Sequence, residues 1–235
     1  TSALAPSASS PATHNPFLSG KSNFRSFGSK AAVMLDAVTR LAEYERLKAL
    51  ATDKFMKSEF EEALKYYVQA CDMIYSTGDT DPARLSCYVV CNSNAAQCCM
   101  NLESFKDAVT YASTALSKDP ENVKALYRCG ASHLYLLEGE NALCDFKRLL
   151  VLDPEKKSMW EPEVKKAATM CLLASVEEGD SERVDSLLGS GAYVHVKSSK
   201  FEGATSLWVA SYLGHYKVVA LLLSKGASVH DRDND

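Results

Sequence analysis

The chain has 235 residues, of which 46% are hydrophobic, 24% charged and 9% aromatic, and its formal net charge is −4. This composition excludes a wholly disordered chain, a collagen-like fibre and a small disulfide-stapled domain. The longest apolar run near the C-terminus, Val218–Leu223, is far shorter than the ~18 residues of a membrane-spanning helix, so we expect no membrane partner. The middle of the chain is acidic and has no lysine or arginine blocks, which argues against nucleic acid as the main partner.

The first 31 residues differ in composition from the rest of the chain. Ser, Ala, Pro and Gly dominate residues 1–31, apolar periodicity is absent, and no acidic residue precedes Asp36. Such a segment cannot bury enough apolar surface to fold alone, so we predict a disordered tail. A Ser-rich, basic and acid-poor stretch is also typical of an organelle transit segment, which is the alternative. A lead-in helix is expected over residues 32–43.

The eight cysteines form no Cys-x-x-Cys pair, and no histidine stands at zinc-finger spacing from them. We therefore predict no metal site and interpret most of these thiols as small buried apolar groups of helices. Such cysteine usage favours a reducing compartment, the cytoplasm, with the nucleus as an alternative. The sequence also lacks the motifs of serine hydrolases, P-loop nucleotide hydrolases, zinc proteases and dinucleotide-binding enzymes, so neither an enzyme nor a cofactor is predicted.

From Tyr44 onward the chain repeats itself with a period of 34 residues. Small residues recur at the eighth and twentieth positions of each unit, and proline stands at the thirty-second position of the last two, at Pro120 and Pro154. Small residues let two antiparallel helices approach closely, and proline ends the second helix. The units span residues 44–77, 89–122 and 123–156, and the predicted helix pairs are 44–57 with 60–75, 86–101 with 104–117, and 122–136 with 139–152.

This pattern resembles the tetratricopeptide repeat (TPR), a helix–turn–helix unit, and predicts a TPR domain over residues 44–157. Three units are enough to bury a continuous core between them. The segment Gly78–Tyr88 is an insertion between the first two units, and its Gly-Asp-Thr-Asp-Pro opening is typical of a turn. We expect residues 83–88 to lengthen the helix that follows.

The repeat changes character towards the C-terminus. Gly179-Asp180 is followed 35 residues later by Gly214-His215, and the second copy resembles the ankyrin repeat. In that copy Thr205-Ser206-Leu207-Trp208 stands where the family shows Thr-Pro-Leu-His. The resemblance predicts ankyrin repeats over residues 170–204 and 205–235, the second of them truncated and the natural protein continuing with more.

The junction between the two repeat types is residues 158–169. A helix is predicted over residues 161–178, with Pro162 in its first turn, where a missing backbone N–H is tolerated. This helix would close the TPR stack and open the ankyrin stack, and Trp160 is expected to pack at the junction. The predicted fold class is therefore all-α, a TPR superhelix that continues into an ankyrin-repeat solenoid.

Five polar side chains recur about one turn apart on the groove-facing side of the first helices of the TPR units, and they are Lys48, Thr52, Asn94, Lys124 and Arg128. They resemble the carboxylate-clamp subfamily of TPR domains, with Thr52 in place of that family's first asparagine. The resemblance implies an acidic partner, the C-terminal Glu-Glu-Val-Asp tail of the cytosolic heat-shock chaperones, held by charge-assisted hydrogen bonds. Because exposed helical residues contribute little to folding, Lys48→Ala or Arg128→Ala should change stability by less than about 0.5 kcal/mol.

The sequence thus predicts a protein-interaction adaptor. Its TPR groove would recruit an acidic chaperone tail, and its ankyrin part would bind a second protein. One alternative is a general scaffold in which the five polar residues are incidental. The other is the targeting arm of a larger enzyme whose catalytic domain lies beyond residue 235.

Overall fold

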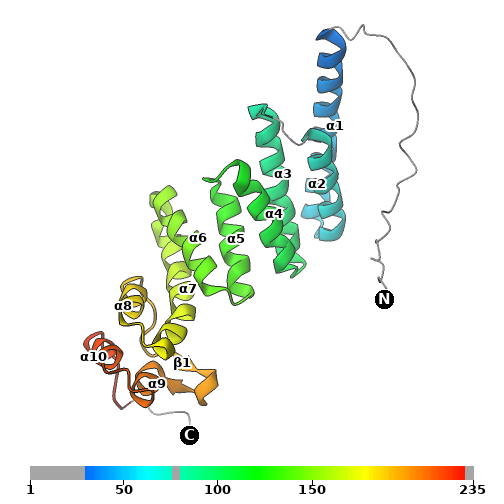
Figure 1. Ribbon diagram of the computed structural model, residues 1–235. Coiled ribbons are helices and arrows are strands. Elements are labelled where there is room, and N and C mark those ends of the chain that lie inside the picture. Colours follow the sequence, from blue (N-terminus) through cyan, green and yellow to red (C-terminus); the bar gives the residue numbers. More distant parts are fainter. Residues whose placement is uncertain (1–29, 76–79, 231–235) are drawn as a thin grey trace, which may run out of the picture. The chain divides into compact units, whose positions relative to one another are not determined.

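The computed structural model describes residues 30–75 and 80–230, with side chains from residue 38 onward (Figure 1). Residues 38–235 form one of the two units into which the chain divides, and residues 1–37 form the other. The tail expected over residues 1–31 lies outside the described residues except for its last two, which begin a helix. No helix among the described residues has the length and apolar character needed to cross a membrane.

Six helices form the three hairpins that the 34-residue period predicts. Consecutive helices from the second to the sixth pack against each other (Figure 1). Buried Tyr44 and Leu47 of the first helix pack with Ala63 and Tyr67 of the second. The helices are α1 (Lys30–Met56), α2 (Phe60–Ile74), α3 (Pro82–Asn101), α4 (Phe105–Lys118), α5 (Val123–Tyr135) and α6 (Gly139–Leu152).

The two ends of this series show how local sequence sets helix length. Helix α1 is continuous over the expected lead-in helix and the first helix of unit one, because no glycine or proline interrupts it. Helix α3 begins at Pro82, and the Asp81 side chain accepts hydrogen bonds from the backbone N–H groups of Ala83 and Arg84. This cap adds residues 83–88 to α3, as the insertion predicted.

The small residues of the repeat lie where the helices of a hairpin touch. Ala63, Ala96 and Ala108 are fully buried. A methyl group on Gly130 of α5 would lie 3.1 Å from the Phe146 ring of α6, so a larger side chain there would separate the two helices. The fully buried Phe146 ring fills this space instead.

Helix α7 (Lys157–Glu178), preceded by the short 3-10 helix η1 (Pro154–Lys156), differs from the predicted helix over residues 161–178. It begins four residues earlier, so Pro162 lies inside the helix rather than in its first turn. The 3-10 helix η1 leads directly into α7. The helix therefore starts before Pro162, the residue that was expected to lie in its first turn. Trp160 is buried as expected, with its ring centre 5.7 Å from that of Tyr127.

The C-terminal part combines short helices with a small hairpin. Lys197 pairs with Thr205 and Ser198 with Ala204 in antiparallel register. Thr205 also caps the next helix, because its hydroxyl accepts a hydrogen bond from the backbone N–H of Trp208. The elements are α8 (Ser181–Gly189), β1 (Lys197–Ser198), η2 (Ser199–Phe201), β2 (Ala204–Thr205), α9 (Ser206–Tyr212) and α10 (Tyr216–Ser224).

One buried apolar cluster runs without a break from α5 to α10. It contains Leu126 of α5, Val164 and Leu172 of α7, and Leu222 of α10. The ring of His215 also bonds the backbone carbonyl of Glu177 through Nε2, at 3.0 Å, and so links the loop before α10 to the end of α7. Helix α7 therefore contributes to the cores of both repeat types.

The cysteines lie almost entirely on helix faces that pack inside this fold. Cys144 on α6 is exposed and Cys87 is half-buried, whereas the other six are buried. Burial raises the pKa of Cys98 to about 12 and that of Cys99 to about 11, so both thiols stay protonated at neutral pH.

Candidate peptide-binding groove

Arg128 is held in place by two neutral side chains of the preceding repeat. Its Nε donates a hydrogen bond to Gln97 Oε1 at 3.1 Å, and its guanidinium also donates to the Ser93 hydroxyl. Ser93 and Gln97 are one turn apart on α3, so both acceptors face α5. Burial lowers the pKa of Arg128, but a guanidinium stays charged at neutral pH. The two acceptors fix this cation without neutralising it.

A cavity of about 320 Å³ opens beside this guanidinium. It is lined by Phe55, Tyr67, Asn94, Gln97 and Arg128. Two of the five residues predicted from the sequence, Asn94 and Arg128, therefore share one cavity, although they come from α3 and α5. The cavity offers an amide and a cation side by side, with aromatic rings contributing apolar wall.

Thr52 belongs to the same neighbourhood through Tyr67. The Thr52 hydroxyl oxygen lies 3.2 Å from the Tyr67 hydroxyl and donates a hydrogen bond to the backbone carbonyl of Lys48 at 2.8 Å. Burial raises the pKa of Tyr67, and hydrogen bonding with Thr52 and Asn94 acts in the opposite direction. The residue at the position of the missing asparagine thus supports the cavity wall rather than extending an amide into it.

A second cavity, of about 610 Å³, adjoins the first because Gln97 and Arg128 line both. Lys124 adds a second cation here, and Met159 and Trp160 from the start of α7 add apolar surface. Among the described residues, neither Lys124 nor Arg128 forms an ion pair with a carboxylate. Lys124 and Arg128 are therefore two unneutralised positive charges along one groove.

Lys48 is paired on its own helix, outside both cavities. Its ammonium lies 3.4 Å from a Glu45 carboxylate oxygen and 5.4 Å from the centre of the Tyr44 ring. Lys48 is not among the residues that line either cavity. It precedes Thr52 by one turn on α1, and Thr52 in turn contacts the cavity-lining Tyr67. Three of the five predicted residues, Asn94, Lys124 and Arg128, line two joined cavities. Thr52 bonds the wall residue Tyr67, and Lys48 lies outside both cavities.

Sequence reasoning missed Ser93 and Gln97, which orient Arg128. The spacing contained a usable signal for Gln97, because it follows Asn94 by three residues and so lies on the same helix face. Ser93 gave no such signal, since a buried serine in a helix is indistinguishable in sequence from a small packing residue.

Comparison with known proteins agrees with this architecture. The ankyrin repeat family matches residues 202–234. FK506-binding protein 59 of Drosophila melanogaster is 33% identical over 119 residues, which cover 51% of this chain and 27% of the relative. The human peptidyl-prolyl cis-trans isomerase FKBP4 is 26% identical over 129 residues, or 53% of this chain and 28% of the relative. The chain thus spans little more than a quarter of the length of these curated relatives.

A solved structure shows the same helical-repeat fold. The C-terminal TPR-containing domain of a Plasmodium falciparum FK506-binding protein superposes with a TM-score of 0.50 and 25% sequence identity, covering 56% of this chain and 89% of that domain. These findings confirm the predicted all-α class and the resemblance on which it depended. The chain carries TPR repeats followed by ankyrin repeats.

Proposed function

We propose that the groove beside Arg128 binds acidic C-terminal tails, such as the Glu-Glu-Val-Asp end of heat-shock chaperones. The observation that carries this proposal is the placement of Arg128, a cation fixed by two neutral acceptors, in one cavity with Asn94. A peptide that ends in aspartate presents two carboxylates within about one residue of each other. A charged donor and an amide donor at one site match that arrangement.

Charge complementarity favours a carboxylate over a neutral ligand at this site. Hydrogen bonds between ionised partners are about twice as strong as those between neutral groups. Lys124 lies one turn before Arg128 on α5, so it extends the positive groove toward the apolar wall of Met159 and Trp160. This wall would hold an aliphatic side chain of the tail while the two cations hold its carboxylates.

Lys48 would join the site by a small rearrangement. Its ion pair with Glu45 is solvent-exposed and three residues apart on one helix, and such pairs contribute about 0–1 kcal/mol. Exchanging Glu45 for a ligand carboxylate therefore costs little. The Thr52 hydroxyl bonds Lys48 and Tyr67 instead of reaching the ligand, so we expect a loss on the order of 1 kcal/mol relative to a clamp with asparagine there.

The ankyrin part would bind a second protein, which makes the chain an adaptor that raises the local concentration of one partner near the other. Binding to cytosolic chaperone tails would place this activity in the cytoplasm. Most of the length of the matched relatives lies outside the aligned region, so the isomerase activity named for one of them is not carried over to this chain. We propose that the described residues bind rather than catalyse.

The test compares Met-Glu-Glu-Val-Asp peptides that end in a free acid or in an amide, measured by isothermal titration calorimetry. Amidation removes one carboxylate, so we expect affinity to fall at least tenfold, the effect of about 1.4 kcal/mol. Lys124→Ala should weaken binding of the free acid comparably. Lys106→Ala, an exposed lysine of α4 away from both cavities, is the matched control and should have no effect. Equal affinities for the two peptides would favour the general-scaffold alternative instead.

A further inference from the structure

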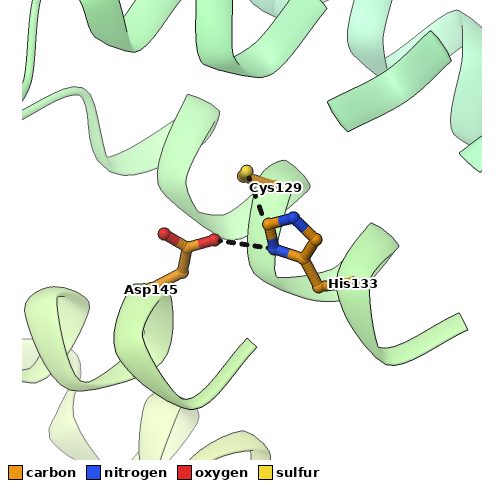
Figure 2. Close-up of side chains that lie close together, drawn as sticks. All are labelled: Cys129, His133 and Asp145. Carbon is orange, nitrogen blue, oxygen red and sulfur yellow. Dashed lines mark hydrogen bonds and ion pairs between the residues drawn. The ribbon is translucent and has the colours of Figure 1, made fainter. Parts of the chain in front are cut away.

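Three metal-binding side chains meet inside the third TPR unit (Figure 2). Cys129 and His133 are one turn apart on α5, and Asp145 reaches them from α6. His133 Nδ1 lies 3.9 Å from the Cys129 sulfur and 3.1 Å from Asp145 Oδ2, and the three ligand atoms lie within 4.8 Å of one another. Tetrahedral zinc with these ligand types would hold its donor atoms about 3.4–3.6 Å apart. The two distances to His133 Nδ1 are within a few tenths of an ångström of these values, and the Cys129 and Asp145 side chains would close on each other around the ion.

The cluster is buried, which makes its charges costly without a compensating cation. Cys129 is 4% exposed, His133 9% and Asp145 8%. A thiolate, a carboxylate and a neutral imidazole around a divalent ion carry no net charge, so a metal would neutralise the site. A mixed sulfur, nitrogen and oxygen donor set is typical of Zn²⁺ rather than of Mg²⁺ or Ca²⁺, which prefer oxygen ligands alone.

The orientation of His133 fits a metal ligand better than a catalytic base. Figure 2 shows Cys129 and Asp145 directed at the same side of the imidazole, and both contacts are to Nδ1. In a nucleophile–base–acid triad the two partners would use opposite ring nitrogens. Here the other nitrogen, Nε2, lies 3.6 Å from a Glu138 carboxylate oxygen. A carboxylate beyond the far nitrogen is the arrangement that orients metal-binding histidines in proteins.

The repeat pattern does not require these residues. The same three positions carry other side chains in the first two units, and none of those units brings histidine or a carboxylate to them. Unit one has Leu50, Lys54 and Tyr66 there, and unit two has Ala95, Cys99 and Tyr111. The third unit therefore differs from the first two at all three positions. Only in the third unit do these positions together carry three side chains that can bind a metal ion.

We propose that Cys129, His133 and Asp145 bind one Zn²⁺ ion that ties α5 to α6, with Glu138 orienting His133 and a fourth position left for water. The sequence predicted no metal site, because it has no Cys-x-x-Cys pair and no histidine at zinc-finger spacing from the cysteines. The signal present was a cysteine and a histidine four residues apart on one helix, which places both on the same face.

The experiment titrates the purified, chelator-treated chain with Co²⁺, a spectroscopic stand-in for Zn²⁺. We expect one equivalent to bind, with a thiolate-to-cobalt charge-transfer band that Zn²⁺ abolishes by displacement. Cys129→Ala should remove this band and lower Zn²⁺ affinity at least tenfold. Unit two carries the buried Ala95 at the equivalent position, so this variant should fold, which circular dichroism would verify.

Cys144→Ala is the matched control, since Cys144 is an exposed thiol next to Asp145. It should keep both the band and the affinity. Asp145→Asn, which preserves volume but removes one charge, should keep the thiolate band while affinity falls. Absence of stoichiometric Co²⁺ binding, or a charge-transfer band that survives Cys129→Ala, would overturn the proposal and leave a cluster that is only hydrogen-bonded.

Discussion

Arg128→Ala should weaken peptide binding and also destabilise the fold, and the structure separates these two effects. The substitution removes two hydrogen bonds from a half-buried cation to Gln97 and Ser93 of the previous repeat. Hydrogen bonds to charged groups contribute about 1.5–3 kcal/mol each. Part of this loss is offset, because the cation no longer has to be desolvated and Gln97 lines cavities that water can enter. We therefore expect a net loss of about 2 kcal/mol.

For a chain of this length, a loss of about 2 kcal/mol corresponds to a fall in Tm of roughly 4–8 °C, measurable by calorimetry. Lys124→Ala removes a cation from the same groove, but Lys124 is exposed and forms no ion pair among the described residues, so its Tm should stay within about 1–2 °C. Both variants should lose at least tenfold in affinity for the free-acid peptide. An unchanged Tm for Arg128→Ala, or an equal fall for Lys124→Ala, would refute the structural role assigned to Arg128.

Two further outcomes follow from backbone geometry and from buried thiols. Gly179 has φ +75°, and a methyl group there would lie 2.6 Å from His215 Nδ1, so Gly179→Ala should lower stability by about 1–3 kcal/mol in urea denaturation. Gly189→Ala, where no atom lies within 4 Å of the added methyl, is the control and should be neutral or stabilising. Stability should also fall as pH rises above about 9, where the thiols of the unfolded chain ionise, while folded Cys98 and Cys99 stay protonated up to about 12 and 11. Replacing Cys98 and Cys99 by alanine should reduce this loss of stability at alkaline pH. A free energy of unfolding of the unmodified chain that is constant up to pH 10.5 would contradict the prediction.

Helix positions were predictable because the periodic pattern records which faces are buried. Ala63, Ala96 and Ala108 occupy positions where only a small side chain allows two helices to touch, so spacing alone located the hairpins. The start of α7 was not predictable in the same way. Pro162 is tolerated in several positions near a helix start, and the 3-10 turn before Lys157 depends on how the chain leaves α6.

The candidate groove was predictable as a set of positions but not as a network. Periodicity places Asn94 and Arg128 on groove-facing helix sides, and the structure puts them in one cavity. The sequence and the structure predict different stability effects for Arg128→Ala. From the sequence, Arg128 is expected to be exposed and the effect small, whereas in the structure Arg128 is hydrogen-bonded to α3 and the expected loss is larger. The pairing of Lys48 with Glu45 also depends on side-chain rotamers, which spacing does not encode.

Because of helix α7, the hydrophobic core continues without interruption from the TPR repeats into the ankyrin repeats. The apolar side chains of α7 belong to one continuous cluster with Phe146 on one side and Leu222 on the other. A protease that cuts within α7 would strip cover from both fragments at once, so we expect limited proteolysis to spare this boundary. Replacing either repeat module during evolution would likewise have to preserve the packing of α7 against both modules. We therefore expect the two modules to be inherited together.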